Sequence, residues 1–211
     1  MYYGIMSSPI THLVLAEKVF EKYFPSKNKA EFMIGTIFPD IRRFAKIDRN
    51  STHFESMKIG SILNESSFMA GYHFHSVVDG LMKKFRLKEE YASLFAESEY
   101  INEVMKTFED MVLMPKIENW DNICRVFDRV MPEEMELFGT DREVVEKWHL
   151  RVQNYIKTMP DYKHSMLGYI VYDPEIVSDA VINGVESIKD KNKATELVER
   201  VYGEFERLLE E

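Results

Sequence analysis

The sequence predicts a single all-α domain, residues 1–211, with a metal site between its N-terminal helices. Apolar residues recur at three- and four-residue steps along most of the chain, which is the period of an amphipathic helix. The chain is 45% hydrophobic and 13% aromatic, which is enough for a packed core. Strand-like alternation occurs only at residues 167–172, a segment too short to anchor a sheet.

The elements follow from this period and from the turn formers between the apolar stretches. We expect the first helix over residues 11–24, where Thr11 can cap its start, and a short second helix over residues 29–36. Residues 41–58 are polar and rich in turn formers, so we expect a loop, followed by a long helix over residues 61–84. Further helices are expected over residues 90–113, 119–131, 140–157, 173–187 and 191–210.

The charge of the chain is uneven. Residues 1–80 carry nine Lys/Arg and eight Asp/Glu, a net +1, whereas residues 81–211 carry 18 and 28, a net −10. An acidic chain lacks the excess of Lys/Arg that neutralises phosphates, so we expect no nucleic-acid partner. The near-neutral first part would admit a small anionic substrate.

The cysteine content and the length of the apolar runs indicate the compartment in which the protein is expected. Cys124 is the only cysteine, which excludes an intramolecular disulfide and suits a reducing compartment. No apolar run approaches the roughly 20 residues that span a bilayer, and the N-terminus lacks a secretory pattern. We therefore expect a cytoplasmic protein without a transmembrane segment; its oligomeric state stays open.

Four of the six histidines lie in the first 80 residues. His75 and Asp79 are four residues apart, so on a helix they share one face and can bind one cation together. His73 lies on a different face, and we expect it to be a buried residue that supports the site rather than a ligand.

Three further candidates precede this pair. Asp40 follows Pro39 at a helix end or turn, His53 lies in the expected loop, and His12 lies in the first turn of an apolar helix. Each residue alone also has an ordinary explanation, respectively a turn aspartate, a surface histidine and a helix-start histidine.

The order and combination of these motifs is more specific than any one of them. The chain reads Ser8-Pro9-Ile10-Thr11-His12-Leu13, Phe32-x-x-Gly35-x-x-Phe38-Pro39-Asp40-Ile41, Thr52-His53-Phe54 and Phe68-x-Ala70-Gly71-Tyr72-x-x-His75-x-x-x-Asp79. Over roughly residues 7–85 this series resembles the zinc-dependent phospholipase C family. That family includes bacterial phospholipases C and, more distantly, fungal single-strand nucleases, and it has an all-α fold with a metal cluster between helices.

The resemblance implies a ligand set and an activity. Asp40, His53, His75 and Asp79 would surround one divalent ion, and His12 would join Asp79 at a neighbouring ion. One or two zinc ions would then activate water for hydrolysis of a small or lipid-like phosphoester, with Asp40 as a candidate to accept the proton of the water.

The chain departs from the family in two respects. The secreted members use an N-terminal Trp as a ligand, whereas this chain begins with Met1 and has no Trp before Trp120. They also use a later His-x-x-x-Glu pair, but here Gln153 and Gly168 stand four residues after the two remaining histidines, His149 and His164. We therefore do not expect a full three-metal cluster.

Two adjacent arginines lie shortly after Asp40 in the sequence. Arg42 and Arg43 are candidates to bind a substrate phosphate, although a solvated basic loop explains them equally well.

Two alternative functions remain. A helical His-Asp phosphohydrolase is disfavoured because the chain has no adjacent His-Asp dipeptide. The alternative of another class is a non-catalytic helical binding or regulatory protein that keeps a structural or vestigial metal.

Overall fold

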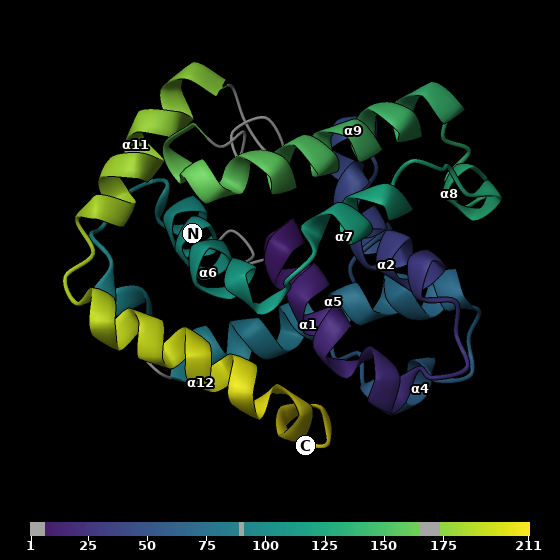
Figure 1. Ribbon diagram of the computed structural model, residues 1–211, viewed down its shortest axis with the longest axis horizontal. Helices are drawn as coiled ribbons and strands as arrows, with labels where there is room; N and C mark the ends of the chain where they lie inside the picture. The colour runs from purple at the N-terminus through teal and green to yellow at the C-terminus, as the bar shows by residue number, and fades with distance from the viewer. Residues whose placement is uncertain (1–6, 89–90, 165–173) are drawn as a thin grey trace.

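The computed structural model describes residues 7–88, 91–164 and 174–211 (Figure 1). These residues form helices joined by turns, and no strand occurs within the described ranges, which confirms the all-α prediction. The strand-like segment 167–172 lies outside the described residues.

The N-terminal part contains more helix than the sequence predicts. Its elements are α1 (Pro9–Tyr23), α2 (Lys29–Ile37), the 3₁₀ turn η1 (Phe38–Ile41), α3 (Arg42–Ala45) and η2 (Arg49–Ser51). The expected loop over residues 41–58 is therefore wrong in its first half. Lys46 ends α3 in the left-handed conformation with φ of 57°, and the Asp48 side chain caps η2 by accepting the Asn50 N–H at 2.7 Å.

The long helix predicted over residues 61–84 is two helices, α4 (Ile59–Ile62) and α5 (Ser67–Lys88). The break falls at residues 63–66. Ser66 Oγ accepts the N–H of Met69 at 3.3 Å, so this hydroxyl caps the start of α5. A serine whose side chain binds a nearby backbone N–H favours the start of a new helix over continuation of the previous one. The period of apolar residues does not reveal such a break.

In the C-terminal part the helix expected over residues 90–113 is wrong in its first half, since an α-helix begins only at Ile101 after a separate 3₁₀ turn, and the elements within residues 114–116, 132–136 and 159–164 were not expected. The elements of this part are, in chain order, η3 (Tyr91–Leu94), α6 (Ile101–Leu113), η4 (Met114–Lys116), α7 (Trp120–Val126), α8 (Pro132–Glu136), α9 (Arg142–Thr158), η5 (Met159–His164), α11 (Pro174–Glu186) and α12 (Lys191–Leu209). The helix expected over residues 119–131 ends at Val126, and Pro132 starts the next helix at a position that proline favours.

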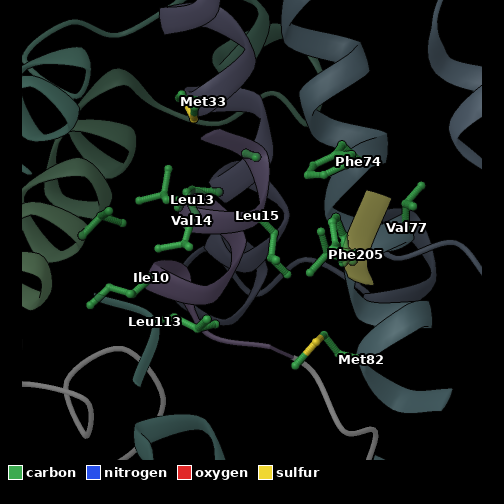
Figure 2. Close-up of a cluster of buried hydrophobic side chains, with 14 of the residues drawn as sticks. Ile10, Leu13, Val14, Leu15, Met33, Phe74, Val77, Met82, Leu113 and Phe205 are labelled. Carbon is green, nitrogen blue, oxygen red and sulfur yellow. The ribbon is translucent and has the colours of Figure 1, made fainter. Parts of the chain in front are cut away.

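Helix α1 runs through the middle of the fold, with α6 on one side and α2 and α5 on the other (Figure 1). Every residue from Pro9 to Ala16 is buried, so this part of α1 contacts protein on all sides. In Figure 2 the side chains of α1, among them Ile10 and Leu15, lie in one cluster with Phe74 and Leu113. Because α1 is enclosed in this way, the helices around it fix the position of its first turn.

Helices α2 and α5 cross in direct backbone contact. A Cβ atom added to Gly35 would lie 2.1 Å from the carbonyl oxygen of Phe68, and one added to Gly71 would lie 2.1 Å from that of Phe32. Only glycine permits this approach. The crossing brings the second half of α2 against the first half of α5, where Nδ1 of His75 lies 2.9 Å from the Thr36 carbonyl oxygen.

In the described ranges, no helix is both long enough and apolar enough to cross a bilayer.

Candidate metal centre

The fold brings five sequence-predicted residues together, and we call them the histidine–aspartate cluster: His12, Asp40, His53, His75 and Asp79. They come from the first turn of α1, from η1, from the segment after η2 and from α5. All five are buried, and His12 and His75 have no exposed surface. Their ligand atoms form two groups that could hold a metal ion, namely His12, His75 and Asp79, and Asp40, His53 and His75.

The orientation of each imidazole is set by a hydrogen bond at Nδ1. Nδ1 of His12 lies 2.9 Å from the carbonyl oxygen of Ser8, and Nδ1 of His75 lies 2.9 Å from that of Thr36. A carbonyl accepts only, so both Nδ1 atoms carry the proton. Nδ1 of His53 lies 2.7 Å from Thr52 Oγ1, whose own hydroxyl donates to the Arg49 carbonyl oxygen at 3.1 Å. His53 Nδ1 is therefore also the donor, and all three Nε2 atoms keep a lone pair for a metal.

These lone pairs converge. Nε2 of His53 lies 3.1 Å from Nε2 of His75, where two neutral acceptors would repel each other. Two Zn–N bonds of 2.0–2.1 Å at a tetrahedral angle place the nitrogens about 3.3 Å apart. The observed separation therefore fits a cation between the two rings.

The Asp79 carboxylate lies between the two halves of the cluster. Its Oδ1 accepts the Ser7 N–H at 2.7 Å and lies 3.4 Å from Nε2 of His12. Its Oδ2 lies 3.8 Å and 3.7 Å from Nε2 of His53 and His75, and it is buried without a hydrogen-bond partner, as is Nε2 of His12. Buried polar atoms without a partner carry a large desolvation cost, which a bound cation would offset.

Asp40 contributes the second carboxylate of the histidine–aspartate cluster. Its Oδ1 lies 3.7 Å from Nε2 of His53 and 3.9 Å from Nε2 of His75. Pro39 and the short η1 turn direct this carboxylate inward from the end of α2. Asp40 thus faces the same point as Oδ2 of Asp79.

The protonation states of His75, Asp40 and Asp79 suit metal binding, whereas a proton competes for His12. Burial and the neighbouring His12 lower the pKa of His75 to about 3, so its imidazole is neutral at pH 7. Burial acts to raise the pKa of Asp40 and Asp79, yet the surrounding imidazoles hold both below the ordinary carboxyl range. Burial acts to lower the pKa of His12, but the Asp79 carboxylate raises it above 6.5.

The geometry limits how the ligands are shared. A neutral imidazole offers one lone pair at Nε2, so His75 can bind only one ion although it belongs to both groups. Two ions would place His75 with Asp40 and His53, and would leave His12 and one oxygen of Asp79 for the second. A carboxylate can bridge two ions because it has two oxygens.

Arg42 and Arg43 lie on α3, directly after Asp40, and both are half-buried. Burial and the charge of Arg43 lower the pKa of the Arg42 guanidinium, whereas the carboxylates of Asp40 and Asp79 act in the opposite direction. Arg42 therefore lies within electrostatic range of two residues of the cluster.

His73 does not lie with the cluster. Its Nδ1 is 2.7 Å from Glu65 Oε2, and its ring packs edge-on against Phe54 and Tyr72. In the described part of the chain no hydrogen bond joins it to the five residues, so the structure gives no support to the expected supporting role. The side chains at i and i+2 diverge around a helix, which is the physical reason.

The sequence-based prediction missed Asp110. Its Oδ1 accepts hydrogen bonds from Ser8 Oγ, from Thr11 N at 2.9 Å and from Thr11 Oγ1 at 2.8 Å, and its Oδ2 accepts from Tyr155 OH at 2.6 Å. Asp110 of α6 thus caps α1 from outside, immediately before His12. Little in the sequence signals this role, because a charged residue on a helix is ordinarily expected to face solvent.

His149 has a structural environment. Its Nε2 lies 2.7 Å from Glu134 Oε1 and its Nδ1 lies 3.1 Å from the Phe127 carbonyl oxygen, which ties α8 and α7 to α9. Both ring nitrogens are thereby engaged. His149 is not part of either candidate metal group found in the described part of the chain.

A pocket of about 540 Å³ opens beside the cluster, between α5 and residues 49–57, and we call it the α5 pocket. His53 and Asp79 line it, so a small molecule in this pocket would reach two of the candidate ligands. Its other walls are formed by Arg49, Phe54, Glu55, Ser56, Met57, Ser76, Val77, Gly80, Leu81, Lys83, Lys84 and Leu87.

Comparison of the chain with protein-family models, with curated proteins and with solved structures found no match. The fold and the cluster describe an all-α protein with His and Asp groups that could bind a metal ion.

Proposed function

We propose that this protein is a zinc-dependent phosphoesterase that holds one or two ions in the histidine–aspartate cluster. The main support is the pair of Nε2 atoms of His53 and His75, which lie 3.1 Å apart with both Nδ1 protons directed elsewhere. Three imidazoles and two carboxylates form a donor set that suits zinc. The motif series that resembles zinc-dependent phospholipase C supports the choice of a phosphoester.

A bound divalent ion would polarise the phosphoryl oxygen and supply a nucleophilic water at neutral pH. Asp40, His53, His75 and Asp79 would hold it, and His12 with Oδ1 of Asp79 would face a second. Arg42, near both carboxylates, would attract the anionic substrate. The lowered pKa of Asp40 favours a ligand over a proton acceptor, because an effective general base has a pKa near the working pH.

The α5 pocket favours catalysis over the alternative of a structural metal. A structural zinc site is closed, whereas a catalytic site keeps a position open to substrate. Two of the candidate ligands, His53 and Asp79, line a pocket large enough for a small molecule.

The test combines metal content with turnover. Purified protein loaded with zinc should contain at least one ion per chain and release phosphate or alcohol from generic phosphomonoesters or phosphodiesters. His75→Ala should lose both properties, whereas His73→Ala, two residues away on the same helix, should keep both. Metal without turnover would indicate a structural or regulatory site, and absence of stoichiometric metal would overturn the proposal.

A further inference from the structure

The α5 pocket places three cationic side chains beside the candidate ligands. Arg49, Lys83 and Lys84 line it, and among its described lining residues the carboxylates are Glu55 and Asp79, so these five charges sum to +1. Within the described part of the chain, no ion pair joins these three cations to a carboxylate.

Two of these cations are placed by the same backbone that places the ligands. Lys83 follows Asp79 by four residues on α5, so their side chains share one face about 6 Å apart. Arg49 precedes His53 by four residues, and the His53 N–H donates to the Arg49 carbonyl oxygen at 2.9 Å. Each wall of the pocket therefore presents a cation about one helical turn from a ligand.

The space between these cations is open. A Cβ atom added to Gly80 would meet nothing within 4 Å, so the wall next to Asp79 is free of side-chain bulk. Lys83 and Lys84 are exposed and Arg49 is half-buried, so an anion bound here would stay in contact with both side chain and water.

We infer that the α5 pocket binds a second anionic group of the substrate, so that the substrate is a small molecule carrying a carboxylate or phosphate in addition to its scissile phosphoester. This inference rests on the proposed function, because it places the scissile group at the cluster. Arg49, Lys83 and Lys84 bind the second anion through charge-assisted hydrogen bonds. A quaternary ammonium group would meet three cations here, and among the described lining residues Phe54 alone offers the aromatic face that its recognition needs.

The test uses phosphonates, whose C–P bond is not a phosphoester and survives the activity. Zinc-loaded protein is titrated calorimetrically with ω-phosphonocarboxylates of two to five methylene groups and with alkylphosphonates of the same lengths. We expect about fivefold or tighter binding of the carboxylate at one chain length, and a loss of this preference at high salt.

Variants locate the second anion. Arg49→Gln, Lys83→Gln and Lys84→Gln should reduce the preference without changing metal content or the affinity for alkylphosphonates. Lys191→Gln, at the exposed start of α12, removes the same charge outside the pocket and should have no effect.

Each other outcome is decisive. Equal binding of the two series would overturn the inference and leave the proposed function intact, whereas binding of neither series to zinc-loaded protein would overturn both. A preference that persists in the three variants would place the anion elsewhere. Equal binding in solution together with Lys83-dependent binding to phosphatidylserine vesicles would assign the cations to a lipid surface and overturn the inference.

Discussion

Asp110 of α6 accepts the backbone N–H of Thr11 of α1 at 2.9 Å, one residue before His12. The same oxygen accepts the hydroxyls of Ser8 and Thr11, so a residue nearly a hundred positions away fixes the start of α1. His12 in turn donates from Nδ1 to the Ser8 carbonyl oxygen. The capping of α1 and the direction of the His12 ring therefore depend on the same contact between α6 and α1.

We predict that Asp110→Ala lowers stability by about 1–3 kcal/mol and weakens metal binding at His12, because it removes the cap and leaves buried donors without an acceptor. Asp110→Asn keeps an acceptor at the Oδ1 position and should largely retain both. Urea denaturation and zinc competition titrations measure the two effects. Equal zinc affinity in wild type and Asp110→Ala would show that the cap does not position His12.

The same carboxyl group should make stability depend on pH. Burial raises the pKa of Asp110 to about 6, against the hydrogen bonds from Ser8, Tyr155 and Thr11. The folded state then holds a proton that the unfolded state has released, so the contribution of Asp110 to stability falls as pH rises from about 4 to 6. The free-energy difference between Asp110→Asn and wild type should shift in favour of the variant over this window and stay level above it. A difference independent of pH would contradict the prediction.

Metal affinity should depend on the protonation of His12. The Asp79 carboxylate raises the pKa of His12 above 6.5, so a proton competes with the metal at Nε2 already near neutral pH. Zinc affinity of the wild type should fall as pH is lowered from 8 to 6, and His12→Gln should remove about one proton from the slope of log affinity against pH. An unchanged slope would exclude His12 as a ligand.

Gly71→Ala should disrupt the crossing of α2 and α5. The added Cβ would lie 2.1 Å from the Phe32 carbonyl oxygen, and backbone can yield only by moving apart. We expect a loss of about 1–3 kcal/mol or more and weaker zinc binding, because His75 would leave the Thr36 carbonyl oxygen. Gly80→Ala on the same helix meets no atom within 4 Å and should stabilise by up to about 1 kcal/mol. Thermal denaturation of both variants compares the two sites; similar effects would refute the close crossing.

A buried ion pair joins α5 to α6. Arg86 Nε donates to Glu109 Oε1 at 2.8 Å, and the residues are 2% and 0% exposed. Glu109→Ala should cost about 3–5 kcal/mol because it leaves a buried guanidinium without its carboxylate, whereas Arg86→Met combined with Glu109→Leu should recover most of the loss. Urea denaturation of the single and double variants gives the coupling. A cost below about 1 kcal/mol for Glu109→Ala would contradict the buried pair.

The helices were predictable where one apolar face dominates, as in α9 and α12. Their breaks were not, because Ser66 and Pro132 end or start helices through local hydrogen bonding and ring geometry that an apolar period does not register. The polar residues of α6 were also missed. Asp110 lies on a face that would be solvated on an isolated helix, and the packing of α1 against α6 buries it.

The order of residues along the chain was enough to predict which side chains could bind a metal, and to predict that His75 and Asp79 share a helix face, because four residues make about one turn. Only the tertiary structure brought His12, Asp40 and His53 to that pair. The glycine crossing of α2 and α5 and the enclosure of α1 set those positions, and they depend on contacts between residues far apart in the chain. The tertiary structure also placed Arg49 and Lys83 around one pocket, since the segment after η2 folds back against α5.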